Sequence, residues 1–467
     1  MHWSTILSSS VLVLQSTAFN MSPSFVLNRG VELGKMTLLS TTREVGESGG
    51  ASHRASIDVV PSFKVMDMVA RANELDEMGA SICHLEVGQP VQAAPPQVLE
   101  AAKNALVDDR LGYTSALGIS ELRASIAESY GRYPDVGGKG TVDSSRVVVV
   151  TGSSAGFLLV FTAAFDPGDV VAIPTTCYPC YRNILGALGV GTANLPLNKE
   201  FKITAKELIE EVQRRRDAGM DRIKGLILSS PGNPTGACLN KEEIYELCEV
   251  CEREGIRFIS DEIYHGIVYG SLKDNEATAL GCESGRRSAI VINSFSKYQC
   301  MTGWRLGWVV LPSGDPGLAD AINRLAQNVY INAPTLSQRA ALALFDDDEV
   351  TKELDARVEE YGKSREVVLN TLKELGLDGP GRVAPAEGAF YVYVDLGEEA
   401  RGDAPGLCMR LLEESGVAIT PGNDFEDKEG GLGNQRVRFS YAGGIEVVEE
   451  GMRRFKEFWP KWVEGRG

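Results

Sequence analysis

The sequence Ser294-Phe-Ser-Lys-Tyr-Gln-Cys-Met-Thr-Gly-Trp-Arg-Leu-Gly-Trp308 contains one lysine, Lys297, among apolar side chains. Phe295, Met301 and Trp304 are three of these neighbours. An apolar environment disfavours the charged form of an amine, so it lowers the pKa of a lysine and frees its nitrogen to attack a carbonyl carbon. The segment therefore predicts a nucleophilic lysine.

The same segment carries groups that bind a phosphate. The hydroxyls of Ser294 and Ser296 flank the lysine on one side, and Arg305 follows on the other. A guanidinium binds oxyanions through two parallel hydrogen bonds, and hydroxyl groups donate to them. An aldehyde that also carries a phosphate is pyridoxal phosphate, so the segment predicts a site for this cofactor. A basic turn packed beside a strand is the alternative for any single lysine.

The composition narrows the class of protein. The chain has 467 residues, of which 43% are hydrophobic and 24% charged, and its formal net charge is −17. This length allows two domains with large cores, and the composition is that of a soluble globular enzyme. The negative charge argues against a nucleic-acid partner, whose binding needs a basic face. We expect no membrane segment, because no later apolar run reaches spanning length.

The nine cysteines include two Cys-x-x-Cys pairs, Cys177/Cys180 and Cys248/Cys251. Together the pairs could form a zinc or redox site, but they are too far apart in the chain for a compact zinc site. The second pair lies in residues 241–254, whose periodicity is helical and places both thiols near a buried stripe. We therefore interpret these cysteines as structural and expect no metal.

The first residues have a composition unlike the rest of the chain. Residues 1–31 contain Arg29, many hydroxyl side chains and no acidic residue. Ser16-Thr-Ala-Phe19 is similar to the Ala-Phe cleavage motif of plastid leaders in algae with secondary plastids. We expect residues 1–54 to be a leader for a plastid or mitochondrion, with a disordered tail of a cytoplasmic protein as the alternative.

From about Ile57 onward, short apolar runs alternate with helical patterns. The runs are residues 146–150, 170–173, 225–228, 257–260, 289–292 and 307–311. Continuous apolar runs separated by helices indicate strands buried on both faces of a mainly parallel sheet. This predicts an α/β fold, with a large cofactor-binding domain over residues 95–325.

A smaller α+β domain is expected from residues 57–94 together with 326–467. Its pattern contains a long helical region over residues 316–375, strands at 389–393 and 436–440, and a helix from 447.

Polar residues follow several of the predicted strands, at the edge where open sheets bind ligands. Asp261 ends one strand, and a buried carboxylate is costly without a positive partner such as a protonated pyridine nitrogen. Tyr264 and Asn233 could hydrogen-bond the ring oxygen, although Asn233 alone would be interpreted as a turn residue.

Two further groups would complete the cofactor site. Ser153 and Ser154 lie in Thr151-Gly-Ser-Ser-Ala-Gly156, where a strand joins a helix whose N-terminus favours an anion. These serines would donate to the phosphate. Tyr178 could supply the aromatic face on which the pyridine ring stacks.

The chain from about Ile57 to its C-terminus resembles the class I/II aminotransferases, which are fold type I pyridoxal-phosphate enzymes. The resemblance rests on motifs in the family's order: Leu85-Glu-Val-Gly-Gln-Pro90, Tyr113 with Gly118 and Leu122-Arg123, Pro231-Gly-Asn-Pro-Thr-Gly236, Asp261-Glu-Ile-Tyr264, Ser294-Phe-Ser-Lys297, Gly303-Trp-Arg305, Glu387-Gly-Ala-Phe-Tyr391 and Arg438-Phe-Ser-Tyr441.

The resemblance implies a role for each site residue. Lys297 would bond to the cofactor and then move the substrate proton. The cofactor would be held by Ser153, Ser154, Tyr178, Asn233, Asp261, Tyr264, Ser294, Ser296 and Arg305. Tyr113 would reach the phosphate in the neighbouring subunit, which implies a homodimer with shared active sites.

The substrate α-carboxylate would be bound by Arg438, with Gly88 and Asn233 assisting. Arg436 lies two positions away, but the family pattern selects Arg438. A surface salt bridge is the alternative for either arginine.

The implied reaction transfers an amino group from an L-amino acid to a 2-oxo acid. Prokaryotic-type aspartate aminotransferases use a lysine near the position of Ser154 to bind a second carboxylate, so the amino donor stays open. A carbon–sulfur lyase of the same fold and a non-catalytic binding protein are the alternatives.

Overall fold

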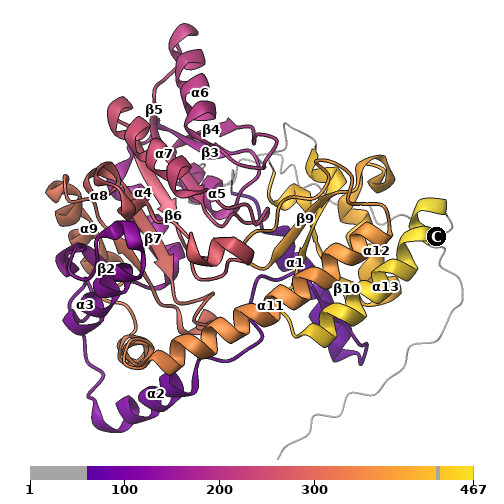
Figure 1. The fold of residues 1–467 in the computed structure, drawn as a ribbon, viewed down its shortest axis with the longest axis horizontal. Coiled ribbons are helices and arrows are strands. Elements are labelled where there is room, and N and C mark those ends of the chain that lie inside the picture. The colour runs from indigo at the N-terminus through magenta and orange to yellow at the C-terminus, as the bar shows by residue number, and fades with distance from the viewer. Residues whose placement is uncertain (1–59, 427–431, 466–467) are drawn as a thin grey trace, which may run out of the picture. The chain divides into compact units, whose positions relative to one another are not determined.

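A seven-stranded sheet with the order β2-β8-β7-β6-β5-β3-β4 organises the larger part of the fold (Figure 1). The strands are β2 (Val147–Val150), β3 (Val170–Pro174), β4 (Gly191–Leu195), β5 (Ile223–Ser229), β6 (Arg257–Asp261), β7 (Ile290–Ser294) and β8 (Gly307–Val310). Only β8 runs antiparallel to its neighbours β2 and β7. This computed structural model describes residues 60–426 and 432–465.

The prediction of an α/β fold with a mainly parallel sheet is confirmed, and all six predicted runs form strands. The sequence did not indicate β4. Its residues are Gly-Thr-Ala-Asn-Leu, and only Ala193 and Leu195 are buried because the strand lies at the sheet edge. An edge strand needs no continuous apolar run, so the pattern that predicts central strands does not find it.

Helices cover both faces of the sheet. Neighbouring strand residues such as Phe258 and Ile259 belong to two separate hydrophobic clusters, as the alternation of side chains along a strand requires. The face of the sheet that carries Ile259 packs against α4 (Gly152–Ala164), α5 (Cys180–Ala187) and α9 (Pro316–Val329). The opposite side packs against α3 (Ser120–Ser129), α6 (Ala205–Asp217) and α7 (Lys241–Glu254).

The boundaries of α7 follow from its sequence. Asn240 accepts a hydrogen bond from the backbone nitrogen of Glu243, whose side chain accepts one from the Asn240 backbone, which is a capping box. Gly255 ends the helix with φ of 67°, a left-handed conformation that glycine adopts without strain. Cys248 and Cys251 lie on its buried face, as predicted.

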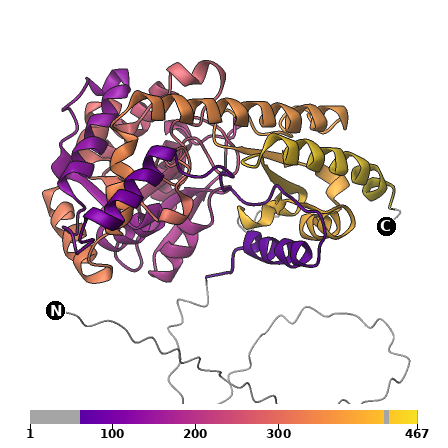
Figure 2. The ribbon, with the colours of Figure 1, turned by 90° about the horizontal axis from the view of Figure 1, so that it is seen from below.

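The C-terminal part contains a three-stranded antiparallel sheet of β11 (Thr420–Pro421), β12 (Arg436–Ser440) and β9 (Tyr391–Asp395). The long helix α11 (Asp348–Glu374) packs against α13 (Ile445–Glu464), and α12 (Ala404–Ser415) lies beside α13. β1 (Cys83–His84) pairs with β10 (Val417–Ala418). Figure 2 shows α1 (Lys64–Glu77) beside these C-terminal elements.

The helical region predicted over residues 316–375 consists of α9, α10 (Thr335–Ala341) and α11. Pro334 precedes α10, and a proline favours a break because it lacks a backbone N–H. Asp347 then caps α11 by accepting from the backbone nitrogen of Glu349. The division into residues 95–325 and 57–94 with 326–467 stays a prediction. The leader proposed for residues 1–54 lies outside the described residues.

No described helix combines the length and apolarity needed to cross a membrane.

One buried amide joins α10 to the segment that follows α2 (Pro96–Asp108). The side chain of Gln338 is fully buried, and its oxygen accepts from the backbone nitrogen of Ile119 at 2.9 Å. Its nitrogen donates to the Ala333 carbonyl at 2.8 Å and to Thr114 Oγ1 at 3.2 Å. The amide therefore fixes the loop that carries Tyr113.

We expect Gln338→Leu to lower the free energy of unfolding by about 2–3 kcal/mol, because it leaves a buried N–H and a buried carbonyl without partners. Gln327→Leu on the exposed face of α9 is the control and should change stability by less than about 0.5 kcal/mol. Denaturant unfolding of the two variants measures the difference. Equal effects would show that the Gln338 hydrogen bonds do not stabilise this contact.

Candidate active site

A cavity of about 740 Å³ lies at the carboxyl ends of β2, β5, β6 and β7. Parallel strands of open sheets bind ligands at this edge. The lining contains most of the predicted site residues: Gly88, Ser153, Ser154, Tyr178, Asn233, Asp261, Tyr264, Ser296, Lys297, Arg305 and Arg438. The structure thus brings together groups that are far apart in the sequence.

Lys297 lies in the cavity without a carboxylate partner among the described residues. Its ammonium nitrogen donates to the Gly88 carbonyl at 2.5 Å. The rings of Tyr264 and Phe390 lie about 6 Å away, at 6.0 and 5.9 Å from the nitrogen to the ring centroids. Burial, together with the charges of the arginines in the cavity, lowers the pKa of Lys297 to about 8.

Asp261 is 2% exposed at the end of β6. The Tyr181 hydroxyl donates to one carboxylate oxygen, and the Ile263 backbone nitrogen donates to the other at 3.2 Å. Burial raises the pKa of Asp261 to about 6, while the hydrogen bond from Tyr181 opposes this shift. No described lysine or arginine forms an ion pair with it, so the carboxylate is available to a cation that enters the cavity.

The polar groups that share the cavity with Asp261 form hydrogen-bonded pairs. Tyr264 shares a hydrogen bond of 2.8 Å with the hydroxyl of Tyr391, and both side chains are buried. The Asn233 oxygen accepts from Arg438 at 3.0 Å, so Asn233 does more than form a turn. The ring of Tyr178 is half-buried and stacks on Phe63 with a centroid distance of 6.1 Å.

An anion site lies at the N-terminus of α4. Gly152 has φ of 73°, and a Cβ at this position would lie 2.4 Å from a guanidinium nitrogen of Arg305. Only glycine therefore allows Arg305 to lie over this helix end. Ser153 and Ser154 follow Gly152, and Ser296 lines the same cavity. Helix N-termini attract anions, and hydroxyl and guanidinium groups add donors.

The two arginines of β12 have different surroundings. Arg436 forms ion pairs with Asp395 at 3.1 Å and Glu426 at 2.8 Å. Arg438 is 4% exposed and donates to Asn233, Thr420 and the Glu86 carbonyl, with no carboxylate partner among the described residues. An unpaired buried guanidinium is costly, so Arg438 is the one suited to bind a carboxylate ligand.

Two predicted residues do not line the cavity. Ser294 is 1% exposed, and its hydroxyl lies 2.9 Å from Ser296 Oγ and 3.2 Å from the Leu306 carbonyl. It therefore supports Ser296 from behind. Tyr113 is 85% exposed on the loop after α2 and is remote from the cavity lining. Its predicted role in a neighbouring subunit stays a prediction.

Sequence reasoning missed several residues of the lining. Tyr181 follows Tyr178 by three positions, a spacing that brings two side chains together at the start of a helix. This spacing is the sequence signal that could have indicated Tyr181. Phe63, Val65 and Met66 come from the start of α1, which lies outside the sheet pattern. Asp424 holds this segment because its carboxylate accepts from two backbone nitrogens of α1, those of Lys64 and Val65.

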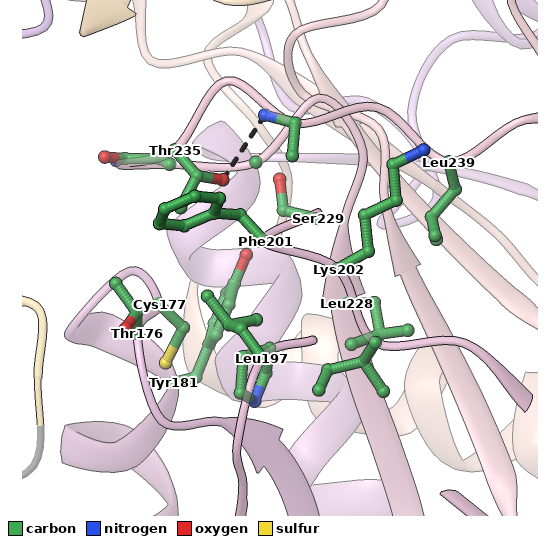
Figure 3. A pocket seen from close by; sticks show the side chains of 15 residues that line it. Thr176, Cys177, Tyr181, Leu197, Phe201, Lys202, Leu228, Ser229, Thr235 and Leu239 are labelled. Carbon is green, nitrogen blue, oxygen red and sulfur yellow. Dashed lines mark hydrogen bonds between the residues drawn. The ribbon is translucent and has the colours of Figure 1, made fainter. Parts of the chain in front are cut away.

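Figure 3 shows a second cavity, of about 40 Å³. Its lining includes Tyr181, Leu197, Phe201 and Lys202. One water needs about 10–15 Å³ of such volume, so this cavity holds a few waters but no amino acid. The larger cavity is therefore the candidate active site. No cluster of three or more metal-binding side chains occurs in the part of the chain that the structure describes.

The sequence model of the family described as aminotransferase class I and II matches residues 80–455. The chain belongs to this family. A valine–pyruvate aminotransferase of Mycobacterium tuberculosis is 41% identical over 404 residues, which cover 86% of this chain and 97% of the relative. A (5-formylfuran-3-yl)methyl phosphate transaminase of Methanocaldococcus jannaschii is 35% identical, with 85% and 96% covered.

A solved structure of an aminotransferase from Mycobacterium tuberculosis is 40% identical and has a TM-score of 0.78, covering 88% of this chain and all of that one. The enzyme is therefore an aminotransferase with the fold of type I pyridoxal-phosphate enzymes, and members of its family generally depend on this cofactor. These findings favour a transaminase over the lyase and the non-catalytic binding protein considered above.

The residues present fit pyridoxal phosphate. Asp261 offers a buried carboxylate for the ring nitrogen, and the helix end under Arg305 offers donors for the phosphate. The Nε of Arg438 is buried without a hydrogen-bond partner among the described residues, as expected for a group that awaits a ligand.

Lys297 should react with acylating reagents at a pH well below that of an ordinary lysine. We expect labelling by acetic anhydride in protein freed of pyridoxal phosphate to rise with a midpoint near pH 8, because only the neutral amine reacts. An isolated lysine derivative, with a pKa of about 10.4, is the reference. Mass spectrometry of the Lys297 peptide gives the midpoint. A midpoint above about pH 10 would contradict desolvation of this amine.

Proposed function

We propose that this aminotransferase binds pyridoxal phosphate in the large cavity and transfers amino groups from L-amino acids to 2-oxo acids through Lys297. One observation supports this most directly: among the described residues, the ammonium group of Lys297 has no carboxylate partner, yet it shares a cavity with Asp261 and Arg438. When bound, pyridoxal phosphate supplies an aldehyde that bonds to amines and a ring that accepts electrons.

Asp261 holds the ring nitrogen in its protonated form. The hydrogen bond from Tyr181 stabilises the charged form of the Asp261 carboxylate. Because the carboxylate is buried, it attracts a cation more strongly than it would in water. Tyr264 and Asn233 would hydrogen-bond the ring oxygen, and the ring of Tyr178 would stack on the pyridine ring. Together with Asp261 these residues would hold the cofactor in the cavity that also contains Lys297.

The phosphate is held at the N-terminus of α4. Ser153, Ser154 and Ser296 donate hydrogen bonds, and Arg305 supplies the positive charge. Ser294 acts indirectly, because its hydroxyl fixes Ser296 at 2.9 Å.

Lys297 moves the proton in each half-reaction. It removes the proton from the α-carbon of the amino donor and later returns a proton to the carbon of the 2-oxo acid. A base is most effective when its pKa lies near the working pH, and a pKa of about 8 meets this condition. The Gly88 carbonyl, 2.5 Å from the nitrogen, positions the amine.

Arg438 binds the α-carboxylate of the substrate. Its guanidinium is fixed by Asn233 and stacks over the rings of Tyr391 and Phe425, at 4.3 and 4.7 Å from the centroids. This arrangement leaves Nε free to donate. A preorganised arginine of this kind reduces the entropy lost on binding.

The remaining wall of the cavity favours donors with apolar side chains. Phe63, Val65, Met66, Val87, Ile263 and Phe425 line it. Position 154 is a serine, so this part of the lining offers no cation for a second carboxylate. A relative of 41% identity is named for valine and pyruvate, which agrees with an apolar donor and a small acceptor.

A homodimer is part of the proposal. Tyr113 is 85% exposed, and Leu106 and Val107 near the end of α2 are 61% and 83% exposed. Exposed apolar side chains in one region are typical of an interface. Tyr113 would then reach the phosphate bound in the neighbouring subunit. The plastid or mitochondrial location rests on the composition of residues 1–54.

Lys297→Ala should abolish transamination, reducing the rate by more than a thousandfold, because the described lining of the cavity contains no other lysine to move the substrate proton. Borohydride treatment of the purified holoenzyme should attach the cofactor to the Lys297 peptide of the wild type and to no peptide of the variant. Lys202→Ala, at a lysine that lines the small cavity and pairs with Glu243, is the control and should keep both properties. Cofactor attachment to another lysine would refute the assignment.

Phe63→Ala and Arg438→Lys should separate side-chain recognition from carboxylate binding. We expect Phe63→Ala to reduce kcat/KM about tenfold for valine and leucine but little for alanine, because about 1–2 kcal/mol of apolar contact is lost. Arg438→Lys should reduce kcat/KM for all three donors alike, since every substrate has the α-carboxylate. Steady-state assays with pyruvate as acceptor for valine and leucine, and 2-oxoglutarate for alanine, measure both effects. A higher kcat/KM for aspartate than for valine would overturn the apolar donor class.

A further inference from the structure

Cys248 and Cys282 form a pair of thiols outside the lining of the active-site cavity. Cys248 is fully buried on α7, whereas Cys282 precedes α8 (Glu283–Ser288). All nine cysteines of the chain lie within the described residues, and Cys282 is the only one that is not buried. It is therefore the thiol that small reagents reach first.

Both sulfur atoms lie close to Gly285. The backbone nitrogen of Gly285 donates to Cys282 Sγ at 3.3 Å. A Cβ built on Gly285 would lie 3.1 Å from Cys248 Sγ, so the second sulfur is in contact with the same residue. Gly285 therefore contacts both sulfur atoms.

The surrounding contacts hold the two segments together. Arg287 of α8 forms a bidentate ion pair with Glu252 of α7, with distances of 2.5 and 2.7 Å. On the other side, the Tyr245 hydroxyl of α7 packs closely against Gly281. Along both segments the cysteines lie between these two contacts, which hold α7 and the start of α8 against each other.

The charges around Cys282 favour its thiolate. The hydrogen bond from Cys248 lowers the pKa of Cys282 to about 7, with further help from the Gly285 N–H and the guanidinium of Arg286. Burial and the carboxylate of Glu249 oppose this shift. The pKa of Cys248 is raised, first by its hydrogen bond to Cys282 and then by burial. One thiol is thus the nucleophile and the other stays protonated.

We propose that Cys282 and Cys248 form a peroxide-reactive dithiol site, in which Cys282 attacks the peroxide and Cys248 resolves the product as a disulfide. The oxidant is hydrogen peroxide or a small alkyl hydroperoxide.

The chemistry has two balanced steps. The Cys282 thiolate displaces hydroxide from hydrogen peroxide, so the O–O bond breaks, an S–O bond forms and the sulfur is oxidised to a sulfenic acid. The Cys248 sulfur then attacks this sulfur, the S–O bond breaks, and the hydroxyl leaves as water with the thiol proton of Cys248. The peroxide is reduced to two molecules of water, and the thiols lose two hydrogens.

The test treats the holoenzyme with one equivalent of hydrogen peroxide and maps its peptides without reduction. We expect a disulfide between the Cys248 and Cys282 peptides that dithiothreitol reverses. Its rate should rise with pH to a midpoint near 7, and at pH 7 it should exceed that of free cysteine by about tenfold, because more thiolate is present.

Three variants distinguish the roles. Cys248→Ser should stop at a sulfenic acid on Cys282, which dimedone traps. Cys282→Ser should abolish the reaction at both positions, and Cys251→Ser, on the same helix but outside the pair, should form the disulfide as the wild type does. Oxidation of other cysteines before Cys282, or conversion of wild-type Cys282 to a sulfinic acid without a disulfide, would overturn the proposal.

Discussion

The active site depends on one energetic cost. The Lys297 amine is buried without a carboxylate partner among the described residues. A pKa lowered from 10.5 to about 8 corresponds to roughly 3 kcal/mol of lost stability at neutral pH. The cost is full below about pH 8 and fades as the pH rises toward 10.5, because the unfolded chain then loses the same proton. The sheet and its two hydrophobic clusters offset this cost elsewhere in the molecule.

The charges around Lys297 explain why such a site suits an anionic ligand. Arg305 and Arg438 both lower the pKa of the lysine, and neither has a carboxylate partner among the described residues. Asp261 lies in the lining at the end of β6, where it could pair with a protonated pyridine ring. The positive charges thus exceed the negative ones near the amine, and a phosphate and a carboxylate would restore the balance.

Much of the fold was predictable because the central strands are buried on both faces. Their continuous apolar runs predict β2, β3 and β5 to β8, whereas the half-exposed β4 has no such run. The residues after β5, β6 and β7 were predictable for the same reason, since the ends of parallel strands share an edge. The pairing of β1 with β10 joins residues more than 300 positions apart, and no local pattern encodes it.

The candidate site was predictable only in part. The sequence pattern preferred Arg438 to Arg436, but the physical difference between them lies in the carboxylates that surround Arg436 in space. Tyr181 had no assigned role because its contact with Asp261 depends on how α5 packs on the sheet. Ser294 was assigned a role that the structure changes. The sequence predicted that its hydroxyl binds the phosphate, but the hydroxyl is bonded to that of Ser296.

The position of Phe63 links the start of α1 to substrate selection. This residue lies a few positions after the start of the described chain, yet its ring stacks on Tyr178 inside the active-site cavity. The backbone nitrogens of the two residues after it donate to Asp424, so the start of α1 is also a wall of the active-site cavity. Proteolytic trimming or a bulky fusion close to Phe63 would therefore alter substrate selection directly, even where the sheet and the cofactor residues stay intact.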